Sequence, residues 1–183
     1  FEPRVLKKIG SQKKIYDVSF IGSFTPYHLQ ATKTLQRLAQ EVPVHVWGTG
    51  LNFLSPTSAL RQYFHGQAWG LDMYRILAQS RIVINRHINV AQNYANNMRL
   101  YEATGMGAML ITDQKQNLND LFRVGKEVVA YKDANDLIDK VKYYLAHDEE
   151  RERISLRGQR RTLKDHTYEK RMKELVKILQ KYL

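Results

Sequence analysis

Short runs of apolar and β-branched residues recur along the chain, separated by longer segments with helical periodicity. Each run has the length and composition of a β-strand. Several are apolar almost throughout, which is typical of a parallel sheet covered on both faces. We therefore predict five strands, at residues 15–21, 42–47, 81–85, 108–112 and 127–131.

Most segments between these runs have apolar positions spaced for one face of a helix. Leu137, Val141 and Tyr144 illustrate the i, i+3/i+4 spacing. We predict helices at residues 27–40, 71–79, 97–105, 134–147, 149–164 and 167–183. Alternation of strands and helices predicts the α/β class, a Rossmann-like parallel sheet flanked by helices, with helices closing the chain. Ligands of such sheets bind beyond the carboxyl ends of the strands.

The length of 183 residues suits one main domain. We assign residues 15–183 to it and residues 1–14 to a basic N-terminal linker. The chain opens with Phe1, and we expect it to be a fragment of a longer protein or a trimmed chain. It contains no cysteine, so disulfides and thiolate metal sites are excluded, and we expect a reducing, cytoplasmic compartment. No metal-binding spacing is present.

The formal net charge of +11 is concentrated at the two ends of the chain. Residues 1–14 contribute +4, residues 151–183 contribute +7, and the middle is neutral. Such ends can bind nucleic acid or an anionic membrane. They can also be a solvated face, or a surface that packs on an acidic partner domain. We favour the second interpretation because no nucleic-acid-binding motif accompanies the charge.

Two loops that follow predicted strands contain glycine. Gly22, in IGSFTP, permits a tight turn and the close approach of a ligand backbone or phosphate. Many α/β domains have a glycine at this place for packing alone, and from this loop by itself we favour that interpretation. The second loop, WGTG at residues 47–50, is explained by ordinary turn chemistry.

The loop after the third predicted strand, residues 86–97, is rich in asparagine. Asn96 or Asn97 can cap the next helix through its side-chain oxygen. The amides at that helix start would then face an anion, and a diphosphate is the natural candidate. His87, at the strand end, can contact a ligand or bond to backbone.

Arg99 and Glu102 stand three residues apart on that same helix. One interpretation is a surface ion pair, which stabilises a helix by only about 0.2–0.5 kcal/mol. The other is a partly buried acid, since apolar residues and Gly105 surround it. A carboxylate so placed can accept both hydroxyls of a ribose. We favour the second interpretation.

Several stretches together resemble a known family. They are YDVSFIGS (16–23), RLYEATGMGAMLITD (99–113), LNDLFRVGKEVVAYKDANDL (118–137) and HTYEKR (166–171). In this order they resemble the C-terminal, donor-binding half of a GT-B glycosyltransferase (glycosyl transferases group 1), closest to the CgeB-like proteins. The resemblance covers residues 15–183.

The resemblance implies a hexosyltransferase that takes sugar from a nucleotide-sugar donor such as a UDP-sugar. It implies that Glu102 binds the ribose and that amides near Asn96 and Asn97 bind the diphosphate. The loop of Gly22 and Ser23 would face the cleft, and the segment of His65 and Gly66 would lie near the base. The residues from 166 onward would open a closing helix that contacts the missing N-terminal, acceptor-binding half.

The chain departs from this pattern in two places. Related enzymes have a second acid eight residues before the ribose-binding one, where this chain has Tyr94. They also have an Arg and a Lys near the first helix, where this chain offers His28 and Lys33. These departures weigh against retaining transfer by the usual site and against strong diphosphate binding. Because catalysis takes place between the two halves, we expect this chain alone to bind donor without turnover.

Two other functions stay open at this point. The first is a non-catalytic GT-B-like module for assembly or surface recognition, favoured by the two departures. The second is a basic binder of nucleic acid or of an anionic surface, favoured by the charged ends.

Overall fold

Five parallel strands form a single sheet in this computed structural model, which describes residues 1–182 and the side chains of all but residues 29–31 and 89. The strands are β1 (Tyr16–Ile21), β2 (His45–Trp47), β3 (Ser80–Ile84), β4 (Met109–Asp113) and β5 (Val129–Tyr131). Their order is β2-β1-β3-β4-β5. The predicted strands and the parallel sheet are confirmed. β2 is shorter than predicted, and Pro43, just before it, has no backbone N–H for the ladder.

The predicted helices are confirmed with shifts of a few residues at their ends. They are α2 (Leu29–Glu41), α3 (Gly70–Gln79), α4 (Met98–Gly105), α6 (Ala134–Ala146), α7 (Asp148–Asp165) and α8 (Tyr168–Leu179). The structure adds two short helices that the periodicity did not predict, α1 (Arg4–Ile9) and α5 (Leu118–Leu121). Residue 183, the last of the predicted closing helix, lies outside the described residues.

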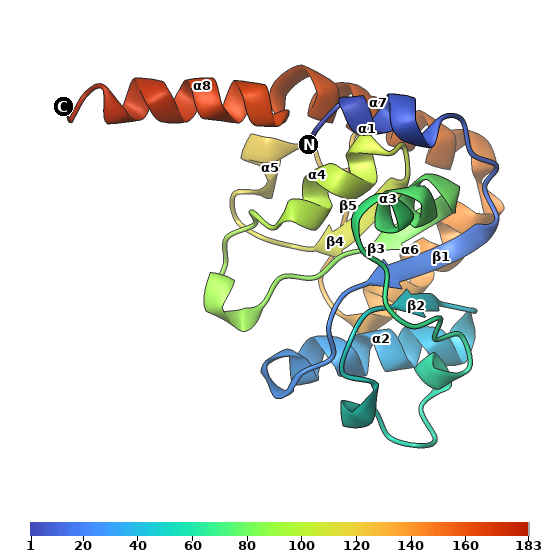
Figure 1. Ribbon diagram of the computed structural model, residues 1–183. Helices are drawn as coiled ribbons and strands as arrows, with labels where there is room; N and C mark the ends of the chain where they lie inside the picture. The colour runs from blue at the N-terminus through green and yellow to red at the C-terminus, as the bar shows by residue number, and fades with distance from the viewer. Residues whose placement is uncertain (183) are drawn as a thin grey trace.

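Helices cover both faces of the sheet, as Figure 1 shows. Apolar side chains of α1, α3 and α4 pack on one face, and those of α2 and α6 pack on the other. Helix α7 packs in both clusters, with Leu163 against the first and Ile154 in the second. Successive residues of β3 alternate between the two clusters: Val83 joins the first, whereas Ile82 and Ile84 join the second. A strand buried on both faces therefore needs an uninterrupted apolar run, which explains the pattern in the sequence.

The basic N-terminal segment is part of the packed body. Helix α1 packs against α3 and places Val5 and Ile9 in the first core cluster, which Phe1, before the helix, also joins. The Phe1 ring also packs edge-on against Tyr74, with ring centroids 6.1 Å apart. The lysines and the arginine of α1 therefore lie on the surface of the domain, because the apolar face of the helix is buried. The division at residue 15 stays a prediction.

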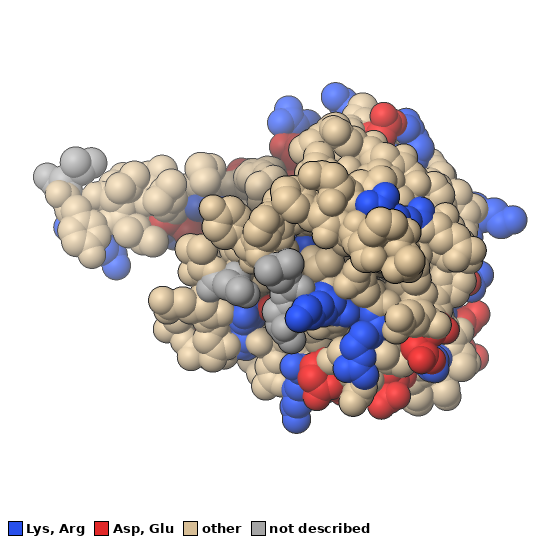
Figure 2. All heavy atoms as spheres, turned by 90° about the horizontal axis from the view of Figure 1, so that it is seen from below, with Lys and Arg blue, Asp and Glu red and all other residues tan. Residues whose placement is uncertain are grey.

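Helix α8 extends away from the body (Figure 1). Its apolar stripe is open: Met172, Leu175, Val176 and Leu179 are between 44% and 51% exposed. In Figure 2, α8 projects at the left and is mostly uncharged on the face in view. None of the described helices combines the length and the apolar character that a membrane crossing requires.

The order of the strands places a crevice at the carboxyl ends of β1 and β3. From β1 the chain crosses to β2 at one edge of the sheet, whereas from β3 it continues through β4 and β5 to the other edge. The loops after β1 and β3 therefore diverge, and open α/β sheets bind ligands where such loops separate.

Candidate functional site

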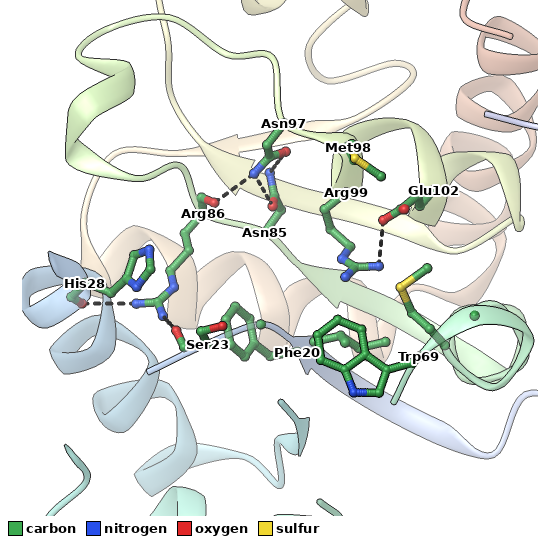
Figure 3. A pocket seen from close by; sticks show the side chains of 14 residues that line it. Phe20, Ser23, His28, Trp69, Asn85, Arg86, Asn97, Met98, Arg99 and Glu102 are labelled. Atoms are coloured by element: carbon green, nitrogen blue, oxygen red, sulfur yellow. Dashed lines mark hydrogen bonds and ion pairs between the residues drawn. The ribbon is translucent and has the colours of Figure 1, made fainter. Parts of the chain in front are cut away.

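A pocket of about 520 Å³ opens at this crevice (Figure 3). Its walls come from the loops after β1 and β3 and from the first turns of α3 and α4. Five of the residues that we predicted to bind the donor line it: Gly22, Ser23, Asn97, Arg99 and Glu102. The structure thus brings together segments that lie up to eighty residues apart in the sequence.

Glu102 and Arg99 form a largely buried ion pair on the first turns of α4. Arg99 Nη1 lies 2.8 Å from Glu102 Oε2, and the side chains of Arg99 and Glu102 are 16% and 7% exposed. The surface interpretation of this pair is therefore wrong. The contact is close, but its geometry is not that of a hydrogen bond, so Arg99 Nε and Nη1 have no hydrogen-bond partner among the described residues. Burial lowers the pKa of Arg99, and Glu102 opposes this effect.

The start of α4 is open to the pocket. Asn97 is the N-cap residue, as one of the two predicted positions, but its side chain accepts no hydrogen bond from the helix. Its Nδ2 instead donates to Asn85 Oδ1 and to the backbone oxygen of Arg86, both at 2.9 Å. The predicted side-chain cap is wrong because this amide joins the β3 loop to α4. The first helical amides are left for another acceptor.

Arg86 ties the loop after β3 to the loop after β1. Its Nη2 donates to the backbone oxygen of Ser23 at 2.6 Å, and its Nη1 donates to the backbone oxygen of His28 at 3.1 Å. The guanidinium also lies over the Phe20 ring, 5.0 Å from its centroid. Burial lowers the pKa of Arg86 to about 10, so it stays charged at neutral pH. Among the described carboxylates none forms an ion pair with it.

The charges around the pocket do not balance. Arg86 and Arg99 are buried cations that line it, and Glu102 is the one carboxylate among its lining residues. Burial and the charge of Arg86 lower the pKa of His28, so this histidine adds no charge at neutral pH. An arginine buried without a carboxylate is costly unless another anion is bound nearby. The pocket is therefore suited to an anionic ligand.

His87 lies behind the pocket rather than in its wall. Its side chain is 1% exposed, and its Nδ1 is 2.7 Å from Asp113 Oδ1 at the end of β4. Hydrogen bonds from His87 and Lys115 lower the pKa of Asp113 against the opposing effect of burial. His87 thus joins the ends of β3 and β4.

His65 and Gly66 lie beside β2, outside the pocket wall. The His65 ring stacks on Trp47 with centroids 4.6 Å apart, and His65 Nε2 is 2.8 Å from His45 Nδ1. Gly66 accepts a backbone hydrogen bond from Gly48 at 2.8 Å. Their chain continues to Trp69 and Gly70, which do line the pocket.

Asn96 lines a smaller neighbouring pocket of about 290 Å³. Its Oδ1 accepts a hydrogen bond from the Tyr101 hydroxyl at 2.9 Å. Met98 and Glu102 line both pockets, so the two cavities are neighbours at the start of α4. His166, which precedes α8, is buried at the second pocket and lies 2.8 Å from the backbone oxygen of Leu121.

The sequence profile of the glycosyl transferase-like family matches residues 29–177. The chain belongs to the glycosyl transferase-like family. A search of curated proteins found no match to this glycosyl transferase-like domain. The comparisons do not name the CgeB-like group, so that narrower assignment stays a prediction.

Solved structures confirm the fold of this glycosyl transferase-like domain as that of the C-terminal half of GT-B proteins. Anabaena Alr3699/HepE in complex with UDP has a TM-score of 0.75 at 11% identity, over 99% of this chain and 56% of that chain. TarM from S. aureus, in a complex that includes UDP, has a TM-score of 0.68 at 13% identity, over 92% of this chain and 37% of the TarM chain. The C-terminal domain of LpcC, a glycosyl transferase group 1 family protein from Francisella tularensis, has a TM-score of 0.61 at 11% identity. This similarity covers 92% of this chain and 94% of that domain.

Reasoning from the sequence missed three residues that line the pocket of this glycosyl transferase-like domain: Asn85, Arg86 and Trp69. Asn85 and Arg86 follow directly after an apolar strand, and polar residues at that place in a parallel sheet are a usable signal. Trp69 gave no comparable signal, because a tryptophan before a helix is usually a core residue.

Proposed function

We propose that this domain binds the nucleotide-sugar donor of a glycosyltransferase in the pocket between β1 and β3. The observation that carries the proposal is a buried carboxylate, Glu102, beside an uncapped helix start and two buried arginines. A nucleoside diphosphate combines what this pocket lacks: hydroxyls for a carboxylate, and an anion for the arginines and amides.

The parts of the ligand follow the chemistry of the wall. Arg99 occupies Oε2 of Glu102, which leaves Oε1 to accept a ribose hydroxyl. The diphosphate lies against the first amides of α4 and beside the guanidinium of Arg99, which lines the pocket. Arg86 adds the charge that the sequence did not offer near the first helix. A UDP-sugar is the first donor to test, because the similar HepE structures contain UDP or UDP-glucose.

The domain acts as one half of a larger transferase in this proposal. It spans 37% of the TarM chain and 56% of the HepE chain. The exposed apolar stripe of α8 would contact the acceptor-binding half, and sugar transfer would take place between the halves. The domain alone would bind donor without turnover.

Calorimetry with UDP, GDP and dTDP tests donor binding by the folded chain. Loss of a hydrogen bond to a charged group costs about 1.5–3 kcal/mol, so Glu102→Gln should weaken binding by about 10- to 100-fold. Glu127→Gln is a matched control, since Glu127 is also a buried acid next to an arginine but lines a different pocket. Absence of heat with all three nucleotides, in protein shown to be folded, contradicts the proposal.

A non-catalytic module is the second candidate function, and one residue favours it. Tyr94 occupies the place of the second acid, is 56% exposed, and does not line the pocket. A module of this kind would bind donor but the complete protein would neither transfer nor hydrolyse the sugar. Release of UDP from UDP-sugars by the complete protein excludes this candidate.

A further inference from the structure

Trp69 is a large aromatic side chain left open at the mouth of the pocket. It is the N-cap residue of α3 and is 69% exposed, whereas the other tryptophan, Trp47, is 5% exposed. Its Nε1 donates to Gln67 Oε1 at 2.8 Å, which restrains one edge of the indole. No described aromatic ring or cation stacks on it. The faces of the indole are therefore available to a ligand.

Trp69 stands at the Glu102 end of the pocket. In Figure 3, Trp69 and Glu102 lie toward one side, whereas Arg86, Ser23 and His28 lie toward the other. The first turns of α3 and α4 both line that end, through Gly70 and Met73 on α3 and through Met98 and Glu102 on α4. Tyr74 lies further along α3. Burial, and to a smaller extent the negative charge of Glu102, raise the pKa of Tyr74 to about 12.

The covalent order of a nucleoside diphosphate restricts where its base can lie. The ribose stands between the base and the phosphates. With the ribose on Glu102 and the phosphates toward Arg86, the base must lie beyond Glu102, at the end where Trp69 is exposed. The thioether of Met73, which also lines the pocket, adds a polarizable contact for an aromatic ring.

We infer that Trp69 is the stacking platform for the nucleobase of the donor; this inference rests on the proposed function. Stacking on an aromatic side chain is tolerant of base identity because every base has a π-face. Trp69 therefore selects nucleotide donors over sugar phosphates that have no base, and leaves the choice among bases to other contacts.

Tryptophan fluorescence combined with calorimetry tests this inference in the 183-residue chain. The ligands are UDP and inorganic pyrophosphate. UDP should change the fluorescence of the wild type, and Trp69→Phe, which leaves buried Trp47 as the sole tryptophan, should lose that change. Trp69→Ala should weaken UDP binding by about 10- to 100-fold, as expected for one base–aromatic stack, and leave pyrophosphate affinity unchanged. Phe53→Ala, at an exposed aromatic outside the pocket, is the matched control and should match the wild type.

The outcomes separate this inference from the proposed function. If UDP binds Trp69→Ala as tightly as the wild type, the base lies elsewhere and the inference is overturned while the donor site stands. If Trp69→Ala loses UDP and pyrophosphate alike, Trp69 supports the shape of the pocket instead of the base, and the inference is again overturned. If the wild type binds neither ligand, the proposed function and the inference fail together. Melting curves of each variant establish that it is folded.

Discussion

Replacing Arg99 with methionine tests whether the Arg99–Glu102 pair is as isolated from water as its burial indicates. The substitution keeps an unbranched side chain of similar length on α4 but removes the charge. Glu102, 6% exposed, would then be a buried carboxylate without an ionic partner. Removing one member of a buried pair leaves the desolvation cost of the other uncompensated.

The geometry gives the size of the expected effect. Two unit charges 2.8 Å apart interact with about 6 kcal/mol at an effective dielectric constant of about 20. Desolvation of the two ions offsets much of this attraction in the intact protein. Because Glu102 also borders an open pocket, water relieves part of the penalty. We therefore expect Arg99→Met to lower the free energy of unfolding by about 2–4 kcal/mol.

Urea unfolding followed by circular dichroism at neutral pH measures this change. The double variant Arg99→Met/Glu102→Met should lie within about 1 kcal/mol of the wild type, because apolar residues of similar volume can replace a buried pair. Lys173→Met removes the exposed partner of Glu169 on α8 and should change stability by under about 0.5 kcal/mol. If Arg99→Met resembles Lys173→Met, the pair is screened by water and the reasoning from burial is refuted.

Three further predictions concern other parts of the molecule. Burial lowers the pKa of Lys14 from 10.5 to about 8. Between these two pH values the unfolded chain binds one more proton than the folded chain, so the free energy of unfolding rises with pH. Lys14→Met should flatten that rise in unfolding experiments over the same pH range. Gly48→Ala should destabilise the domain by more than about 1 kcal/mol in urea unfolding, because the backbone of Gly48 has a positive φ and a Cβ would collide with the Gly22 carbonyl; a stability equal to that of the wild type would show that the two loops can separate. Leu175→Lys, on the open stripe of α8, should leave the melting temperature of the isolated domain unchanged, and a large drop would place that stripe against the body.

The elements of the fold could be predicted from the sequence because each depends on local pattern. A strand covered on both faces needs a continuous apolar run, and a helix on a sheet needs an apolar stripe. The exceptions are instructive. Helix α1 has only six residues and lies in a segment, residues 1–14, that contains five lysines and arginines. Its two buried positions therefore give no clear apolar stripe. Tertiary packing on α3, not periodicity, stabilises it.

The sequence by itself determined that a carboxylate and an arginine share one helix start after a strand, since that depends on spacing along one element. Only the tertiary structure decided which distant residues join them. Arg86 comes from the loop after β3 and Trp69 from the start of α3, and the strand order brings both to the pocket that Glu102 also lines. Burial was also decided by the tertiary structure, because the same i, i+3 spacing describes a surface pair and a pair inside a pocket. Burial depends on what the rest of the chain packs around a residue, and spacing alone does not encode it.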